Sequence, residues 1–324
     1  MTQPAGRLPL AIFCGKGGVG KTTLSLAFAL AHATAGKTAL LVTSHPLAEL
    51  AVSVSLAGLK IKFPQAAARL FVTHIDPKEI LQQTVKHQIP SEMLADAVLS
   101  SRIYQSLIEV APGLKEMVFL GRLQQLAEQR ASPVSGPVSG PVSGDAVGDA
   151  AASRYDLVVW DAPATGHFLQ TMEVSRHFSL YLSGPFALLG KEISRFFSDA
   201  DNFALVPVTT LEEMAVEETI ELCGKLSGKL GMRPRSVICN MASPLLSSDN
   251  GKQNNNSSLT PVGIAADSRL QFILDRLAVE RSLFDHLRSH VELKPYIVER
   301  KHRFGTDLDL LLDLSKHLDG LLES

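Results

Sequence analysis

The sequence predicts an α/β fold, a doubly wound and mostly parallel sheet with an inserted helical subdomain. Short apolar runs recur along the chain, and stretches with helical patterning separate them. The runs are mostly continuous rather than alternating, which is expected of strands that are covered by helices on both faces. The regular alternation of such strands with helices favours a parallel sheet.

Seven runs are apolar enough to be strands of this sheet, and the helical stretches between them are the expected crossovers. The first run is followed by a glycine-rich segment and the fourth by an aspartate, so both are expected to end at a binding site. In chain order the predicted strands lie at residues 10–14, 38–43, 70–75, 155–160, 203–208, 236–239 and 291–298.

The chain is predicted to be a single domain, residues 1–324, with three additions to the sheet. Residues 77–130 exceed a normal crossover, and we expect them to form a helical subdomain together with residues 170–200. Flexible surface loops are expected at 131–153, which holds three copies of PVSG, and at 243–263, which is polar. Strand-like runs continue on both sides of these loops, so neither is a domain boundary.

Composition excludes several classes of protein. There are 31 basic and 33 acidic residues, a balance that argues against a general nucleic-acid binder. The three cysteines are far apart, which rules out a zinc ribbon and indicates a reducing, cytoplasmic location. The most apolar region, Leu24–Ala35, is too short to cross a bilayer, so no stable membrane insertion is expected.

The first strand leads into the sequence GKGGVGKT, which fits the P-loop pattern G-x-x-x-x-G-K-[ST]. Glycines let the backbone turn tightly, so that consecutive N–H groups and the amino end of the next helix face phosphate oxygens. Lys21 is expected to reach the β- and γ-phosphates, and Thr22 to bind Mg²⁺. The residues expected to hold the nucleotide here are Gly15, Gly17, Gly18, Val19, Gly20, Lys21, Thr22 and Thr23.

Two further residues extend this site. Asp161 ends the fourth strand, the Walker-B position from which an aspartate orients Mg²⁺ through water. Lys16 makes the loop resemble the deviant P-loop class, which includes partition ATPases of the ParA/MinD type and the nitrogenase iron protein. That resemblance implies that Lys16 crosses a homodimer interface to the partner's nucleotide, in the role of an arginine finger.

Within this class the chain resembles the arsenical-pump and tail-anchored-protein targeting ATPases. The residues that carry the likeness are DAPATGH at 161–167, VTTLEE at 208–213 with Leu211 in place of a proline, and Asn240 at a strand end. The resemblance implies a dimeric Mg²⁺-dependent ATPase that opens and closes with the state of its ATP, and an adenine-recognising role for Asn240. It also implies a protein client, which the sequence does not name.

The departures from the family pattern leave alternatives open. His45 stands where the family carries the aspartate that positions the attacking water, so hydrolysis is expected to be slow. A nucleotide-binding regulatory switch with little or no hydrolysis is the first alternative. The carboxylate nearest to His45 in the sequence is Glu49, which could position the water instead. The second is a positioning ATPase of the MinD/ParA type, although the C-terminal segment 306–324 is acidic and is expected to pack on the sheet instead.

Cysteine usage excludes other branches of the class. The targeting branch carries a CxxC zinc clasp near residues 245–275, where this chain has no cysteine, so no zinc is expected. A nitrogenase-like reductase lacks support because cluster-binding cysteines are missing. Cys14, Cys223 and Cys239 are expected to be buried small hydrophobes rather than ligands of arsenite.

Overall fold

The computed structural model describes residues 8–44, 58–88, 91–102, 104, 113–128, 155–181, 185–248, 268–301 and 307–322. A parallel sheet of seven strands, in the order β3-β2-β4-β1-β5-β6-β7, forms the centre of this part of the chain. The predicted α/β fold is therefore confirmed. The strands are β1 (Leu10–Gly15), β2 (Ala39–Thr43), β3 (Leu70–His74), β4 (Leu157–Ala164), β5 (Phe203–Thr210), β6 (Ile238–Ala242) and β7 (Tyr296–Glu299).

The strand β1 lies near the middle of the sheet and is buried along its whole length. Its side chains alternate between two hydrophobic clusters, with Leu10 and Ile12 in one and Ala11 and Phe13 in the other. Because both faces are covered, the strand is apolar at every position, which is why its sequence shows no alternation.

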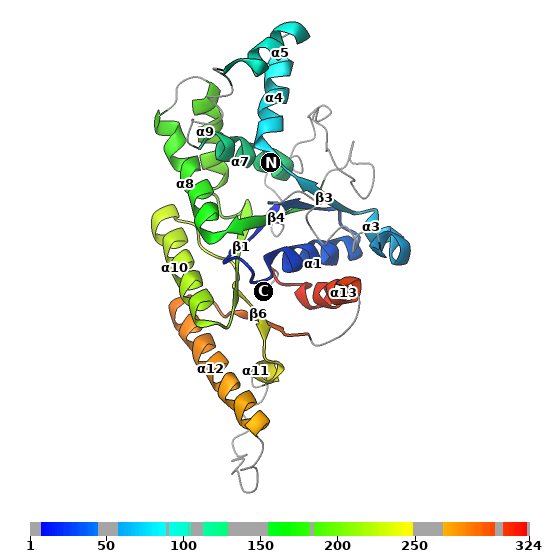
Figure 1. The fold of residues 1–324 in the computed structure, drawn as a ribbon, viewed down its shortest axis with the longest axis vertical. Coiled ribbons are helices and arrows are strands. Elements are labelled where there is room, and N and C mark those ends of the chain that lie inside the picture. The colour runs from blue at the N-terminus through cyan, green and yellow to red at the C-terminus, as the bar shows by residue number, and fades with distance from the viewer. Residues whose placement is uncertain are drawn as a thin grey trace.

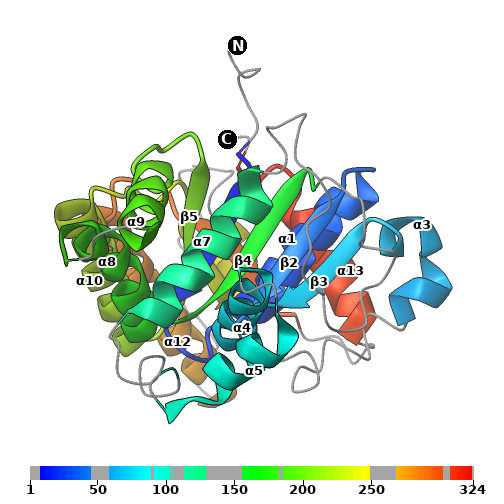
Figure 2. The same ribbon diagram turned by 90° about the horizontal axis from the view of Figure 1, so that it is seen from above.

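Helices cover both faces of the sheet (Figures 1 and 2). On one face, α1 and α13 share a hydrophobic cluster with the strands, and on the other α7, α8, α9 and α10 do so. The described helices are α1 (Lys21–Thr34), α3 (Pro64–Ala67), α4 (Pro77–Gln88), α5 (Glu92–Ser100), α7 (Leu114–Glu128), α8 (Thr165–Tyr181), α9 (Pro185–Phe196), α10 (Glu213–Leu230), α11 (Pro244–Ser248), α12 (Ser268–His290) and α13 (Asp307–Leu318).

The helices α4 to α9 occupy the ranges in which a helical subdomain is predicted. The helices α4 and α5 extend past the sheet at the top of Figure 1, whereas α7 and α8 pack directly on it. Met117 and Phe168, for example, lie in the same cluster as Leu10. The boundaries of this subdomain, and the single domain 1–324, stay predictions.

Four sequence expectations differ from the structure or lie beyond it. The last predicted strand, 291–298, begins later, because residues 291–295 form the bend between α12 and β7, which spans Tyr296–Glu299. The strand β4 continues to Ala164, past the predicted end at Trp160, because Asp161 is in register with Phe13 of β1 and Thr43 of β2. The predicted loop 243–263 begins instead with the one-turn helix α11, whose first residue is a proline, a favourable residue at that position. The loop at 131–153 lies outside the described residues.

The C-terminal helix α13 packs against α1, as Figure 2 also shows. Its buried leucines, Leu308, Leu311, Leu314 and Leu318, join the cluster that includes α1 and β1. The expectation that this acidic amphipathic segment packs on the sheet layers is therefore confirmed. None of the helices in the described ranges has both the length and the apolar character needed to cross a bilayer.

Candidate functional site

The P-loop connects the end of β1 at Gly15 to the start of α1 at Lys21. Three of its glycines have positive φ angles that other residues rarely adopt: 136° at Gly15, 84° at Gly18 and 93° at Gly20. Gly15 is also required by space, because a Cβ atom there would lie 2.3 Å from the carbonyl oxygen of Val208 on β5. The loop therefore presents backbone, together with the amino end of a helix, at the carboxyl end of the central strand.

Lys21 folds back over this loop. Its Nζ donates to the carbonyl oxygens of Gly15 at 2.9 Å and Lys16 at 2.8 Å, and its side chain is buried. Burial lowers the pKa of the Lys21 ammonium, and the negative charge of Asp161 opposes that shift. The ammonium thus lies buried against the loop in which phosphates are expected, under the electrostatic influence of Asp161.

Thr22 and Asp161 meet beside the loop. The Thr22 hydroxyl donates to Oδ2 of Asp161 at 2.6 Å, and Asp161 is buried in β4 between β1 and β2. Ser44, at the end of β2, donates through its hydroxyl to the main-chain oxygen of Asp161. A threonine hydroxyl and a carboxylate at this separation form an all-oxygen donor pair, which fits Mg²⁺.

Asn240 of β6 contacts the loop directly. Its Nδ2 donates to the carbonyl oxygen of Val19 at 2.8 Å, and a Cβ on Gly20 would lie 2.4 Å from the same nitrogen. The next residue, Met241, lies within β6 and has a φ of 56°, which is unusual for a side-chain-bearing residue and coincides with a register shift between β6 and β7. The amide predicted to recognise adenine thus also fixes the loop that is predicted to hold phosphate.

The other residues predicted for the nucleotide site are more exposed than Lys21 and Asp161 or lie outside the described residues. Lys16 is half-buried, Thr23 lies half-buried in the first turn of α1, and Gly17 and Gly18 are exposed. None of the described acidic side chains forms an ion pair with the Lys16 ammonium. His45 and Glu49 lie outside the described residues, so the expectations for both remain predictions.

Two contacts were not predicted from the sequence. Ser44 follows directly after β2, and only its position at the carboxyl end of a strand next to β4 could have indicated its bond to Asp161. Glu280 of α12 is buried and accepts the N–H of Ser243 at 2.8 Å, which anchors the chain just after Asn240. Nothing local in the sequence indicates this second contact.

Comparison with known proteins gives one family match. The model of a family described as anion-transporting ATPase matches residues 9–191. The chain is similar to an arsenical pump-driving ATPase of Escherichia coli, with 24% identity over 250 residues that cover 72% of this chain and 39% of that relative. The chain therefore spans about two fifths of the length of this pump-driving ATPase.

Two shorter relatives are covered more fully. One is ATPase BagA of Mycobacterium tuberculosis, with 25% identity over 244 residues that cover 72% of this chain and 65% of the relative. The other is a putative arsenical pump-driving ATPase 2 of Aquifex aeolicus, with 26% identity over 266 residues that cover 72% of this chain and 79% of the relative.

Proposed function

The chain belongs to the anion-transporting ATPase family, and from this premise we propose that it binds and hydrolyses ATP with Mg²⁺ at its P-loop. The observation that carries the proposal is the convergence of Lys21, Thr22 and Asp161 at the end of β1. These three residues supply a cation for phosphate and two oxygen ligands for a divalent metal.

Each group has a distinct role in this proposal. The N–H groups of residues 15–20 and the amino end of α1 bind the phosphate oxygens, since α1 begins without a side-chain cap. The Lys21 ammonium exchanges its bonds to the loop carbonyls for the β- and γ-phosphates. Thr22 and Asp161 hold Mg²⁺, which, when bound, neutralises charge on the phosphate oxygens. Asn240 accepts from the adenine edge through the amide oxygen that its bond to Val19 leaves available.

We further propose a homodimer that closes on ATP, with Lys16 acting on the partner's nucleotide. The exposed face of the loop, at Gly17 and Gly18, supports this because a second protomer has access to it. The Lys16 ammonium has no acidic partner among the described side chains. A cation that reaches developing phosphate charge in trans stabilises the transition state more than the bound nucleotide.

Of the alternatives, a positioning role of the MinD/ParA type gains no support from the described C-terminal helix. Such a role needs a cationic amphipathic segment that can lie on a membrane. The amphipathic helix at the C-terminal end, α13, has acidic residues in its first turn and buries its apolar face against α1.

The other alternative is a regulatory switch with little or no hydrolysis. This alternative depends on His45, which lies outside the described residues. An active ATPase and a switch without hydrolysis differ in the expected effect of substituting His45. If His45 accepts a hydrogen bond from the attacking water, His45→Ala lowers turnover. If hydrolysis has been lost, His45→Ala has no effect, and His45→Asp raises turnover, because a positioned base contributes about 10²–10⁴ in rate.

The proposed nucleotide site is tested by calorimetric titration of Mg²⁺-ATP. Lys21→Ala is expected to abolish detectable binding, because it removes the cation that faces the phosphates. Lys60→Ala, which removes an exposed lysine on another helix, is the matched control and is expected to bind like the unaltered protein. Unchanged affinity in Lys21→Ala would refute the site, provided that both variants show the thermal stability of the folded protein.

A further inference from the structure

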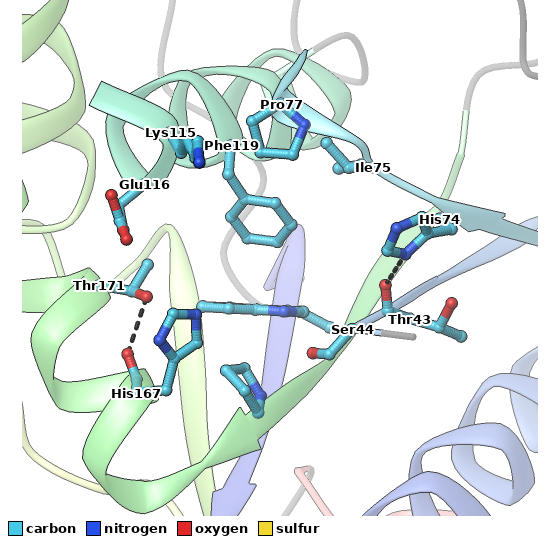
Figure 3. A pocket seen from close by; sticks show the side chains of 12 residues that line it. Thr43, Ser44, His74, Ile75, Pro77, Lys115, Glu116, Phe119, His167 and Thr171 are labelled. Atoms are coloured by element: carbon cyan, nitrogen blue, oxygen red, sulfur yellow. Dashed lines mark hydrogen bonds between the residues drawn. The ribbon is translucent and has the colours of Figure 1, made fainter. Parts of the chain in front are cut away.

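A second cavity lies beside the P-loop site. It has a volume of about 250 Å³ and is lined by residues from β2, β3 and β4 or directly after them and from helices α4, α7 and α8 (Figure 3). None of the lining residues belongs to the P-loop. The volume equals that of about eight liquid water molecules, which suits a small organic molecule rather than a nucleotide.

One wall of the cavity is aromatic. The rings of Trp160 on β4 and Phe119 on α7 line it, with centroids 5.1 Å apart. Trp160 is 1% exposed, and its indole N–H is a buried donor for which the described residues provide no acceptor. The indole nitrogen is out of reach of a water-sized molecule, so Trp160 contributes its ring and not its N–H to the wall of the cavity.

The polar lining includes one ammonium group, one carboxylate and two histidines. Figure 3 shows Lys115 and Glu116 on α7, His167 on α8 and His74 at the opposite side of the cavity. Two main-chain carbonyl oxygens at the wall already accept hydrogen bonds. That of Thr43 accepts from Nδ1 of His74 at 3.0 Å, and that of His167 accepts from the Thr171 hydroxyl at 2.8 Å. The Lys115 ammonium forms no ion pair with any described acidic side chain.

From this arrangement we infer that the cavity binds a small organic monocarboxylate with a compact apolar body. The carboxylate accepts from the Lys115 ammonium, and the apolar body lies against the aromatic wall. Glu116 is the one carboxylate among the lining residues, and it would repel a second negative charge on the ligand. The cavity therefore selects one negative charge over two.

The site lies close enough to the P-loop to influence it. Ser44 lines the cavity and donates to the main-chain oxygen of Asp161, whose carboxylate accepts from Thr22. A ligand that contacts Ser44 therefore acts on the strand that positions Asp161. This coupling rests on the proposed ATP site, and linkage requires that carboxylate and nucleotide change each other's affinity by the same factor.

The binding is tested on the protein without nucleotide, so the outcome does not depend on ATP binding. Trp160 is the only tryptophan in the chain and lines the cavity, so the intrinsic tryptophan fluorescence reports on the surroundings of this residue. Titration with benzoate is expected to change the fluorescence saturably, whereas benzamide and benzylamine are expected to bind far more weakly. No saturable change with benzoate, or equal binding of benzylamine, would overturn the inference.

Two variants test the charge assignments. Lys115→Gln is expected to weaken benzoate binding about 10- to 100-fold, because a hydrogen bond to a charged group is lost. Lys191→Gln, an exposed lysine on α9 that does not line the cavity, is the matched control and is expected to bind normally. Glu116→Gln is expected to admit the dianion phthalate. Equal benzoate affinity in Lys115→Gln and its control would exclude Lys115 as the group that binds the carboxylate.

The coupling has its own measurement. Benzoate is titrated with and without a saturating, slowly hydrolysed ATP analogue, and a change in its affinity is expected. Identical affinities, in a protein shown by calorimetry to bind the analogue, would overturn the coupling. A protein that binds benzoate but no analogue would contradict the proposed ATP site instead.

Discussion

Asn240 can act in two ways, by supporting the P-loop through its hydrogen bond to Val19 and by contacting adenine, and the structure allows these two roles to be tested separately. Asn240 is 7% exposed and Val19 is 3% exposed, so their 2.8 Å hydrogen bond is shielded from water. Asn240→Ala leaves the Val19 carbonyl oxygen buried without this donor, which costs about 1–3 kcal/mol. At about 2–4 °C per kcal/mol for a chain of this size class, the melting temperature is expected to fall by roughly 2–12 °C.

Asn240→Asp is expected to be more damaging than Asn240→Ala. The aspartate keeps the shape of the side chain but turns a carboxylate oxygen toward the Val19 carbonyl oxygen, so two acceptors face each other. An ionised carboxylate buried without a partner is more costly than a missing amide. The order of stability, unaltered protein above Asn240→Ala above Asn240→Asp, is measured by thermal unfolding.

Nucleotide titrations then distinguish the two roles. If Asn240 only supports the loop, Asn240→Ala weakens ATP, GTP and inorganic tripolyphosphate by the same factor. We expect it to weaken ATP further, by about tenfold for each 1.4 kcal/mol of lost adenine contact. Unchanged stability together with unchanged tripolyphosphate affinity would refute the supporting role.

Asn202 offers a matched control for these measurements. Its Nδ2 also donates to a main-chain oxygen, that of Phe196 at 3.1 Å, but outside the P-loop. Asn202→Ala is therefore expected to lower stability while leaving every ligand affinity unchanged. A loss of ligand affinity in this variant would show that the effects of Asn240→Ala are not specific to the loop.

Three further predictions address the loop, the dimer and the cysteines. Gly15→Ala is expected to cost about 2–6 kcal/mol in unfolding experiments, because its Cβ meets a main-chain oxygen at a positive φ, whereas Gly17→Ala, with open space around it, is expected to keep its stability. Lys16→Ala is expected to lower turnover by about 10³ or more with little change in ATP affinity, and equal turnover in the two proteins would contradict its action in trans. Burial raises the pKa of Cys223 and Cys239 to about 12, so iodoacetamide at pH 8 is expected to label the unfolded chain far faster than the folded one. The same shifts predict that the free energy of unfolding falls as the pH rises from about 8.5 towards 12, where the unfolded thiols ionise and the folded ones do not.

The sheet and the phosphate-binding loop could be predicted because their signals are local. Continuous apolar runs gave the strands, and the pattern from Gly15 to Thr22 gave the loop between β1 and α1. The end of β4 was placed too early because the polar Asp161 interrupts the apolar run. The ladder continues through it nonetheless, since neighbouring strands on both sides pair with it.

Contacts between segments that are distant in the sequence could not be predicted from apolar runs or local motifs. Asn240 and Val19 are 221 positions apart, so no pattern in either segment indicates their hydrogen bond. The cavity beside Trp160 takes its lining from three strands and three helices and depends on how these pack together. Its residue types, a tryptophan, a lysine and histidines, are common enough that only their spatial convergence is informative.

The geometry of the P-loop is set by the order of the strands around it. The loop follows β1, and the neighbouring strand β4 supplies Asp161 for Thr22. On the other side, β5 approaches Gly15 so closely that no side chain fits, and β6, one strand further, supplies Asn240 for Val19. Each of these contacts exists only if the strands lie in the order β4-β1-β5-β6. A substitution that shifts any of these strand ends therefore changes the phosphate site without touching it, and this is why stability and ligand affinity must be measured together in every variant.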